Sequence, residues 1–301
     1  MRIIIGYVVS FFKAIDKRIL FLSILFTSCL IFINYYFKLN DHINAYGEIL
    51  QYASWYVIFL IAFSFAYFLL VYFKRSTIFN NRAFLLLLFI APLLFAWKMA
   101  ASVDFVQTGN ELYNYWNKVI YWPFKLIIML AALFIVWRVL DRQQEFYGLT
   151  LQNFVARPYL IMLLIMIPLI AIASTQPDFL AMYPKLKTIQ LGEEIGGWQK
   201  LLYELSYGSD FFTIELFFRG FLVLAFSKWV GKDAILPMAI FYCTIHFGKP
   251  LGECISSFFG GIILGVVILH TRTIFGGLMV HLGIAWLMEL GGYVGNIGCS
   301  F

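Results

Sequence analysis

The chain has 301 residues, of which 62% are hydrophobic, 20% aromatic and only 13% charged, and its mean hydropathy is +0.85. Soluble domains carry about a quarter charged residues, so this composition excludes an ordinary soluble protein. The apolar runs are long, which excludes the short alternating segments of a membrane β-barrel. The net charge of +6 is spread through short loops, where it orients helices in a bilayer and does not indicate nucleic-acid binding.

The chain therefore predicts an all-α, polytopic membrane protein with about eight or nine transmembrane helices. The start of the chain is basic, and the apolar run that follows has no small-residue cleavage site, so we expect a retained first span. Five spans are expected in the first 174 residues. They lie between Arg18 and Lys38 and at Gln51–Phe73, Arg82–Trp97, Val119–Trp137 and Pro158–Ser174.

A polar and amphipathic connecting segment at 175–207 follows, and we expect Trp198–Leu205 to form a short helix along the membrane surface. The predicted division is thus 1–174, 175–207 and a carboxyl-terminal core at 208–301. Four further spans belong to this core. They are expected at Gly208–Phe226, Ala234–Phe247, Cys254–His270 and Ile274–Leu290.

The distribution of lysine and arginine between alternate loops predicts a cytoplasmic amino terminus and an external carboxyl terminus. The four cysteines show no paired spacing, so we expect small buried hydrophobic side chains without a disulfide framework. They are Cys29, Cys243, Cys254 and Cys299.

Ionisable side chains recur in the last apolar segments. Glu215 and Arg219 are four positions apart, which places them on one face of a helix where they can pair. His246 and His281 each lie in a later segment. Such residues are costly in lipid, and short loops force these segments together, so they indicate a functional site. A pair that only neutralises itself, and histidines that only satisfy the core, are the structural alternatives.

A carboxylate near two imidazoles suits the activation of water, with the glutamate taking the proton and the imidazoles stabilising an oxyanion. His246 and His281 could instead bind a metal, most plausibly zinc, although the spacing is not that of a helical zinc motif. No cofactor is certain. Asp210 and Glu253 are further catalytic candidates, and each could equally be a helix-capping residue.

Four stretches of the last hundred residues resemble the CPBP family of intramembrane proteases. This family is related to the type II CAAX prenyl endopeptidases and includes bacteriocin-processing and self-immunity members. The stretches are Ile214-Glu-Leu-Phe-Phe-Arg-Gly220, Tyr242-Cys-Thr-Ile-His-Phe-Gly-Lys-Pro250, Gly261-Ile-Ile-Leu-Gly265, and Thr273-Ile-Phe-Gly-Gly followed by His281. The resemblance covers about residues 200–295 and implies a CPBP-like core.

Two positions depart from the family pattern. Ile214 stands where the family has the first glutamate, the residue usually assigned to water activation, and Ala285 stands where asparagine or aspartate would follow His281. Two replacements are open. Glu215 could itself act as the base, or Asp210, one turn before Ile214, could project its carboxylate towards the vacant place.

We therefore expect an intramembrane endopeptidase, of glutamic or metallo type, that hydrolyses peptide bonds of a membrane-embedded peptide or protein. The alternative is a catalytically inactive CPBP-like scaffold or immunity factor. A transporter is a third class, but the chain shows no related halves. The expected location is a cell membrane, specifically a bacterial inner membrane, with the lipid bilayer as a partner and no nucleic acid.

Overall fold

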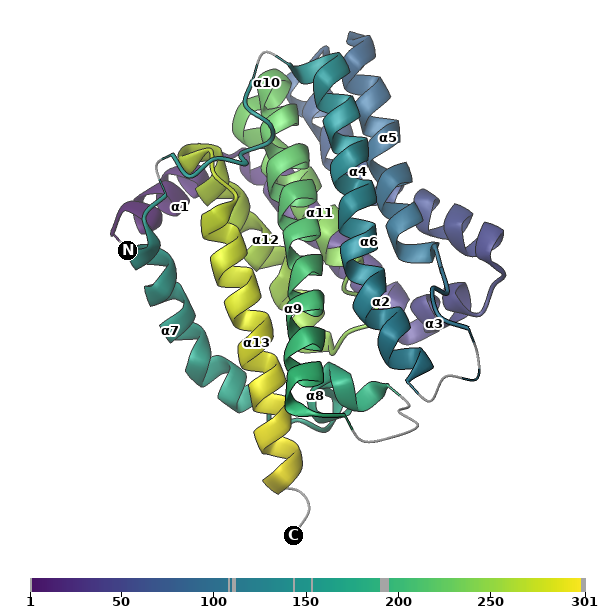
Figure 1. The fold of residues 1–301 in the computed structure, drawn as a ribbon. Coiled ribbons are helices and arrows are strands. Elements are labelled where there is room, and N and C mark those ends of the chain that lie inside the picture. The colour runs from purple at the N-terminus through teal and green to yellow at the C-terminus, as the bar shows by residue number, and fades with distance from the viewer. Residues whose placement is uncertain are drawn as a thin grey trace.

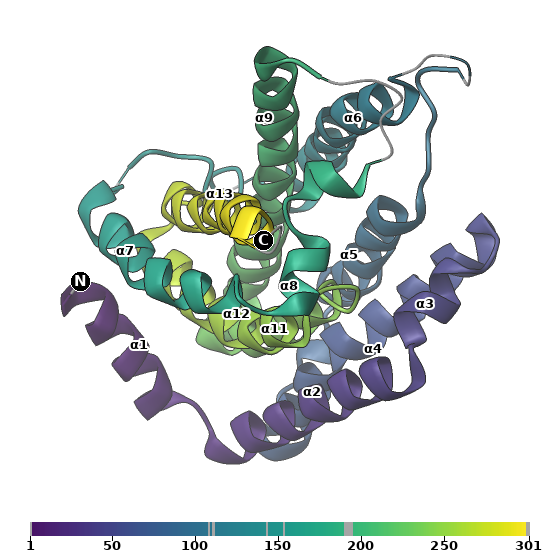
Figure 2. The same ribbon diagram turned by 90° about the horizontal axis from the view of Figure 1, so that it is seen from below.

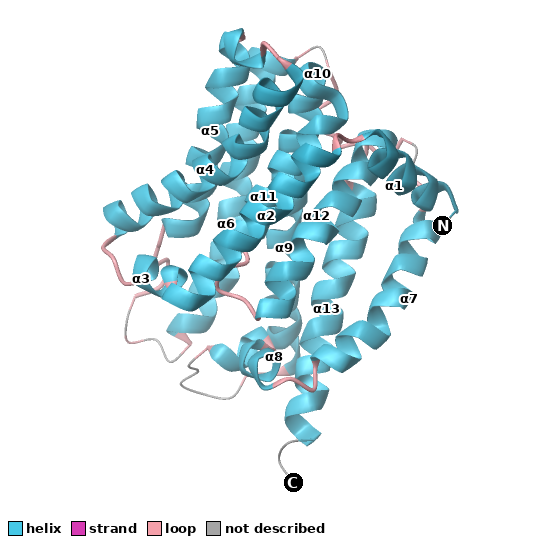
Figure 3. Ribbon diagram, turned by 180° about the vertical axis from the view of Figure 1, so that it is seen from behind, coloured by secondary structure: helices cyan, strands magenta, loops and turns pink. Residues whose placement is uncertain are grey.

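The structure is a computed structural model that describes residues 2–107, 109, 112–142, 144–152, 154–189 and 195–298. Within these residues it contains helices and loops and no strand, which confirms the all-α prediction (Figure 3). The α-helices are α1 (Arg2–Ala14), α2 (Lys17–Phe37), α3 (Leu39–Asn44), α4 (Glu48–Lys74), α5 (Arg82–Ala100), α6 (Tyr113–Val136), α7 (Ala156–Ala173), α8 (Pro177–Met182), α9 (Gly197–Ile214), α10 (Phe226–Val230), α11 (Ile235–Thr244), α12 (Leu251–Thr271) and α13 (Phe275–Gly298).

Five further segments are wound differently. The 3-10 helices are η1 (Ile78–Asn80), η3 (Lys185–Thr188) and η5 (Gly231–Ala234), and the π-helices are η2 (Trp137–Asp141) and η4 (Glu215–Ala225). Seven helices in the described chain are long and apolar enough to cross a membrane, which confirms a polytopic protein. They correspond to α2, α4, α5, α6 with η2, α7, α12 and α13.

The two other expected spans differ from the prediction. The span expected at Ala234–Phe247 is largely α11, which has 10 residues and is therefore about 15 Å long, half the thickness of the hydrocarbon layer. The span expected at Gly208–Phe226 is the end of α9 together with η4, which follows it directly. The short surface helix predicted at Trp198–Leu205 is wrong, because these residues form the first turns of α9.

Helix α11 lies at the centre of the bundle. All of its residues are buried, and it packs against α2, α4, α12 and η4 (Figures 1 and 3). A helix that is apolar on every side is stable only when other helices surround it. The fold thus places the end of α11, where His246 follows, inside the protein and not at a lipid-facing surface.

Aromatic side chains join the amino-terminal helices to this centre. The ring of Phe241 on α11 lies 4.8 Å from Phe59 on α4 and 5.2 Å from Phe218 on η4, while Phe95 on α5 lies 4.9 Å from Phe218. Edge-to-face and tilted pairs at these distances are favourable beyond the apolar area that they bury. The amino-terminal helices therefore support η4 directly.

The remaining helices surround this centre in pairs. Helix α6 packs along α9, α7 along α13, and α1 against α12 (Figure 2). The start of α1 lies at one side of the bundle, and the end of α13 lies at its lower end in the view of Figure 1. The site residues discussed below come from η4, the turn after α11, α12 and α13, which meet in the interior.

Candidate active site

Glu215 and Arg219 form a fully buried ion pair on η4. Arg219 Nη1 lies 3.3 Å from Glu215 Oε1, and the two side chains are 1% and 0% exposed. The sequence predicted an α-helix here, and the π winding still leaves residues four apart on the same side. π-Helical segments are rare and occur frequently at functional sites.

His281 on α13 links this pair to Tyr242 on α11. Its Nδ1 lies 2.9 Å from Glu215 Oε1 and its Nε2 lies 3.1 Å from Tyr242 Oη. A carboxylate paired with arginine can only accept a hydrogen bond, so Nδ1 carries the hydrogen and donates it. In the neutral imidazole, Nε2 then accepts from the Tyr242 hydroxyl. Both nitrogens are engaged, which fixes the ring orientation.

Tyr242 contacts three other members of the cluster, which are Arg219, His246 and His281. Its ring stacks on the Arg219 guanidinium, with Arg219 Cζ 3.9 Å from the ring centroid. Its carbonyl oxygen lies 2.9 Å from His246 Nδ1 and can only accept, so this nitrogen of His246 is also the one that carries hydrogen. His246 Nε2 has no hydrogen-bond partner within the described chain, and in the neutral ring it carries a free lone pair.

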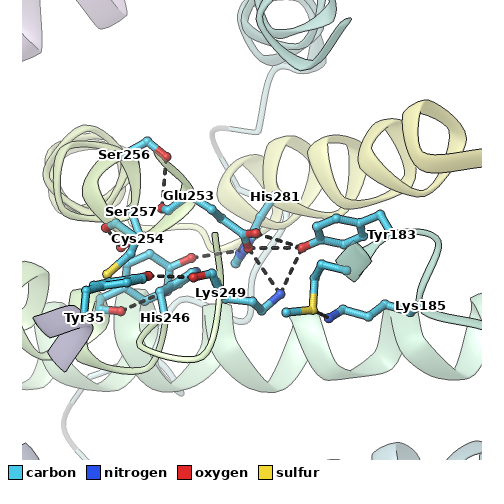
Figure 4. A network of polar contacts seen from close by, with 12 residues as sticks. Tyr35, Tyr183, Lys185, His246, Lys249, Glu253, Cys254, Ser256, Ser257 and His281 are labelled. Atoms are coloured by element: carbon cyan, nitrogen blue, oxygen red, sulfur yellow. Dashed lines mark hydrogen bonds and ion pairs between the residues drawn. The ribbon is translucent and has the colours of Figure 1, made fainter. Parts of the chain in front are cut away.

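A second group of polar side chains surrounds Glu253 in the first turn of α12 (Figure 4). Lys249 Nζ lies 3.2 Å from Glu253 Oε1, and the Tyr183 hydroxyl donates to Glu253 Oε2 at 3.0 Å. Glu253 also interacts electrostatically with His246. Burial alone would lower the pKa of Lys249, but the Glu253 carboxylate outweighs it and holds the pKa above its usual range.

The site thus has a buried layer and an accessible layer. Glu215 and Arg219 are enclosed, whereas the side chains of His281 and Glu253 are 13% and 17% exposed, and His246 is also partly exposed. Water or a substrate can reach the second layer only. The first layer holds the second in place.

Residues 207–287 match the family described as type II CAAX prenyl endopeptidase, Rce1-like. This segment contains Glu215, Arg219, His246, Glu253 and His281. This segment of the chain is therefore similar to the type II CAAX prenyl endopeptidases, to which the CPBP family is related. No curated protein and no solved structure matches the chain. The resemblance found in the sequence motifs is therefore confirmed, and the matched segment coincides with the helices that bring the ionisable residues together.

Asp210 lies outside the cluster in the CPBP core. Its Oδ1 is 2.7 Å from Lys98 Nζ on α5, so its carboxylate pairs across to the amino-terminal helices. Asp210 was one expected replacement for the missing first glutamate, but its carboxylate pairs with Lys98 instead. Ile214 at that place is 9% exposed and belongs to the main hydrophobic core, and Ala285 is 4% exposed and packs near Tyr207.

The histidines do not form a ready metal site. Among the described residues, no three His, Cys, Asp or Glu side chains are arranged to hold a metal ion. Both nitrogens of His281 are already hydrogen-bonded, so a zinc ion bound by His246 and His281 would have to displace Glu215 or Tyr242. Zinc binding by His246 and His281 stays a prediction from the sequence.

A glycine allows α13 to approach the buried ion pair. A Cβ at Gly277 would lie 2.4 Å from Glu215 Oε2, far inside van der Waals contact. We expect Gly277→Ala to displace Glu215 from His281 and to lower the free energy of unfolding by about 1–3 kcal/mol. Thermal unfolding of purified protein measures this. Gly260→Ala is the matched control, because a Cβ there meets nothing within 4 Å; equal stability of the two variants would contradict the prediction.

Lys185 on η3, near the Glu253 group, gives a pH-dependent expectation. Burial, helped by the Lys249 charge, lowers the pKa of Lys185 to about 7. A lysine in the unfolded chain titrates near about 10.4, so between these values the unfolded chain binds more protons. Stability should therefore rise with pH from about 7 to 10. We expect Lys185→Met to flatten this rise in the unfolding temperature and Lys187→Met to retain it; an unchanged slope in Lys185→Met would refute it.

Sequence reasoning missed three members of the site. Tyr242 entered only as the aromatic residue of a motif, although its spacing of four from His246 is the signal that places both on one side of a helix. Lys249 stood in the quoted stretch without a role. Tyr183 comes from the connecting segment before α9 and gave no local signal, because only the tertiary fold brings its hydroxyl to Glu253.

Proposed function

We propose that the CPBP core hydrolyses peptide bonds of a membrane-associated peptide or protein. The observation that carries the proposal is the pair of oriented histidines. His281 is held by Glu215 and Tyr242, His246 is held by the Tyr242 carbonyl and has a free Nε2, and the charge of the Glu253 carboxylate acts on His246. An oriented imidazole with a free lone pair next to a carboxylate is suited to general base catalysis.

In the proposed reaction, His246 Nε2 takes a proton from a water molecule, and the water oxygen bonds to the carbonyl carbon of the substrate. Glu253 stabilises the positive charge that His246 acquires. The Tyr242 hydroxyl turns its one hydrogen from His281 Nε2 to the oxyanion of the tetrahedral intermediate, while His281 keeps its hydrogen bond to Glu215. His246 then gives its proton to the leaving amine as the carbon–nitrogen bond breaks.

Glu215 acts in this scheme as a positioning residue. Its Oε1 already accepts from His281 and faces Arg219, and the side chain is fully buried, so it is not placed to meet a water molecule or a substrate. In this scheme Glu215 therefore does not take over the water-activating role of the family's first glutamate, whose position Ile214 occupies. The accessible carboxylate of Glu253 supplies the negative charge next to His246.

The test compares peptide termini in membrane fractions by mass spectrometry, from cells with the intact chain and with Glu215→Gln. The glutamine keeps an acceptor for His281 but loses the charge that neutralises Arg219. Termini that disappear in the variant, at equal protein abundance and with the variant still showing a cooperative unfolding transition, support hydrolysis and identify the substrate. Identical termini under the same conditions would refute proteolysis that depends on this site.

A non-catalytic CPBP-like scaffold or immunity factor is the second candidate. The buried Ile214 favours it, because an aliphatic side chain in the hydrophobic core occupies the position of the family's water-activating glutamate. This candidate predicts that Glu215→Gln retains function wherever the protein remains folded. The comparison of termini separates it from the endopeptidase.

The membrane setting of the proposed substrate follows from the seven apolar helices and the family match. We propose a bacterial inner membrane as the location, with a cytoplasmic amino terminus. The distribution of lysine and arginine supports this orientation. The orientation is tested by labelling Lys187→Cys and Lys232→Cys in intact cells with a thiol reagent that does not cross the membrane. The proposed orientation places Lys187 outside and Lys232 on the cytoplasmic side, so only Lys187→Cys should be labelled. Labelling of Lys232→Cys alone would show the opposite orientation.

A further inference from the structure

A cavity of about 1170 Å³ lies between η3, α9 and α13, and its lining on α13 begins at Trp286, five residues after His281. Its walls are mainly apolar, with Leu201, Leu205, Trp286 and Tyr293 among them. His281, Ala285 and Glu289 follow each other at intervals of four, so they lie along one face of α13. The cavity therefore begins one to two helical turns from His281.

Two carboxylates line this otherwise apolar cavity, Glu204 from α9 and Glu289 from α13. Glu289 is 7% exposed, and its Oε1 is buried without a hydrogen-bond partner in the described chain; its Oε2 accepts from the backbone N–H of Lys185 at 2.8 Å. Glu204 Oε2 is likewise buried and unpartnered. Leaving such atoms unsatisfied is costly, so they indicate a missing partner.

The lining points to the chemistry of that partner. Ions such as calcium require six or more oxygen ligands, which two carboxylates among aliphatic and aromatic side chains do not supply. Of the charged residues that line the cavity, Lys187 and Lys200 are exposed and Glu289 is buried, so within the lining the negative charge lies deeper than the positive charge. A long side chain with an apolar stem and a cationic end matches this gradient.

We infer that the cavity is a substrate subsite that binds a lysine or arginine side chain of an otherwise apolar polypeptide, through Glu204 and Glu289. The inference rests on the proposed endopeptidase function. Eight residues of α13 separate Glu289 from His281, which is about 12 Å along the helix axis. An extended peptide covers that distance in three or four residues. The basic residue should therefore stand about three or four positions from the scissile bond.

The experiment measures binding without hydrolysis. The full chain with His246→Asn is held in lipid nanodiscs, and fluorescent, end-blocked peptides of leucine and alanine are titrated by anisotropy. The peptides differ only in one central residue, which is lysine, glutamine or glutamate. We expect the lysine peptide to bind about tenfold more tightly than the glutamine peptide, as for one charge-assisted contact.

Glu289→Gln should bring this ratio close to one, since glutamine keeps an acceptor for the Lys185 N–H but loses the charge. Glu204→Gln should lower the ratio independently, and Glu145→Gln, an exposed glutamate away from the cavity, should leave it unchanged. Equal binding of the lysine and glutamine peptides, tighter binding of the glutamate peptide, or an unchanged ratio in both cavity variants would overturn the inference.

The peptide-binding experiment and the comparison of peptide termini can give opposite answers, so the failure of one proposal is distinguishable from the failure of the other. A lysine preference that depends on Glu289, in a protein that generates no peptide termini in cells, would retain the subsite and remove the endopeptidase. Cleavage sites without a basic residue near the bond, in a protein that does generate termini, would remove the subsite and retain the endopeptidase.

Discussion

His246→Asn is expected to abolish most of the proposed hydrolysis while leaving the fold intact. The asparagine amide can donate to the Tyr242 carbonyl as His246 Nδ1 does, at 2.9 Å in the parent structure, but it provides no nitrogen at the Nε2 position. Loss of a general base lowers the rate by about 10²–10⁴-fold. The rate is measured on the substrate identified from membrane peptide termini, with purified protein.

The chain offers a matched control for this variant. His270 Nδ1 lies 2.9 Å from the carbonyl oxygen of Val266, again four residues earlier, so His270→Asn makes the same local change on α12. It should retain the parent rate. If His246→Asn also stayed within about threefold of the parent, His246 would not be the base, and Glu253→Gln would become the decisive variant.

Arg219→Met is expected to lower the free energy of unfolding by about 3–5 kcal/mol, because it leaves the Glu215 carboxylate fully buried without its cation. It also removes the guanidinium that stacks on the Tyr242 ring. Chemical unfolding in detergent, followed by tryptophan fluorescence, measures the change. A change below about 1 kcal/mol would show that the buried pair is not needed for stability.

Two comparisons identify the cause of this loss. Arg18→Met removes an arginine that is 63% exposed and paired with Asp16, and should leave unfolding unchanged. Combining Arg219→Met with Glu215→Met should recover much of the lost stability, since replacing both members of a buried ion pair by apolar groups is often neutral. The double variant should still lose activity, because His281 then has no acceptor at Nδ1.

Composition was sufficient to predict the membrane class and most of the spans, because long apolar runs have few alternative structures. It failed for α11. The segment Ala234–Phe247 is apolar on every side, which fits a helix in lipid and a helix inside a protein equally well, and only the surrounding helices decide between them. The prediction of a separate surface helix at Trp198–Leu205 was wrong for a related reason. An amphipathic segment fits a short helix on the membrane surface and the first turns of a longer helix such as α9 equally well.

The sequence predicted those site residues whose ionisable side chains are costly to place in a membrane. Glu215, Arg219, His246 and His281 are conspicuous because ionisable groups are rare in apolar segments. Asp210 was misplaced because its partner Lys98 is over a hundred residues away in sequence and no local pattern links them. Tyr183 escaped for the same reason, since a tyrosine in a polar segment resembles many interfacial tyrosines.

The position of α11 has a consequence for how the chain folds. The segment that matches the family, 207–287, includes α11 but not α2 or α4, which cover it. Expressed alone, that segment would expose an entirely apolar helix and the rings of Phe218 and Phe241 to lipid or detergent, without the aromatic partners on α4 and α5. We therefore expect the matched segment to fold as one cooperative unit with the amino-terminal helices, so that a chain cut between them recovers its structure only when both halves are present together.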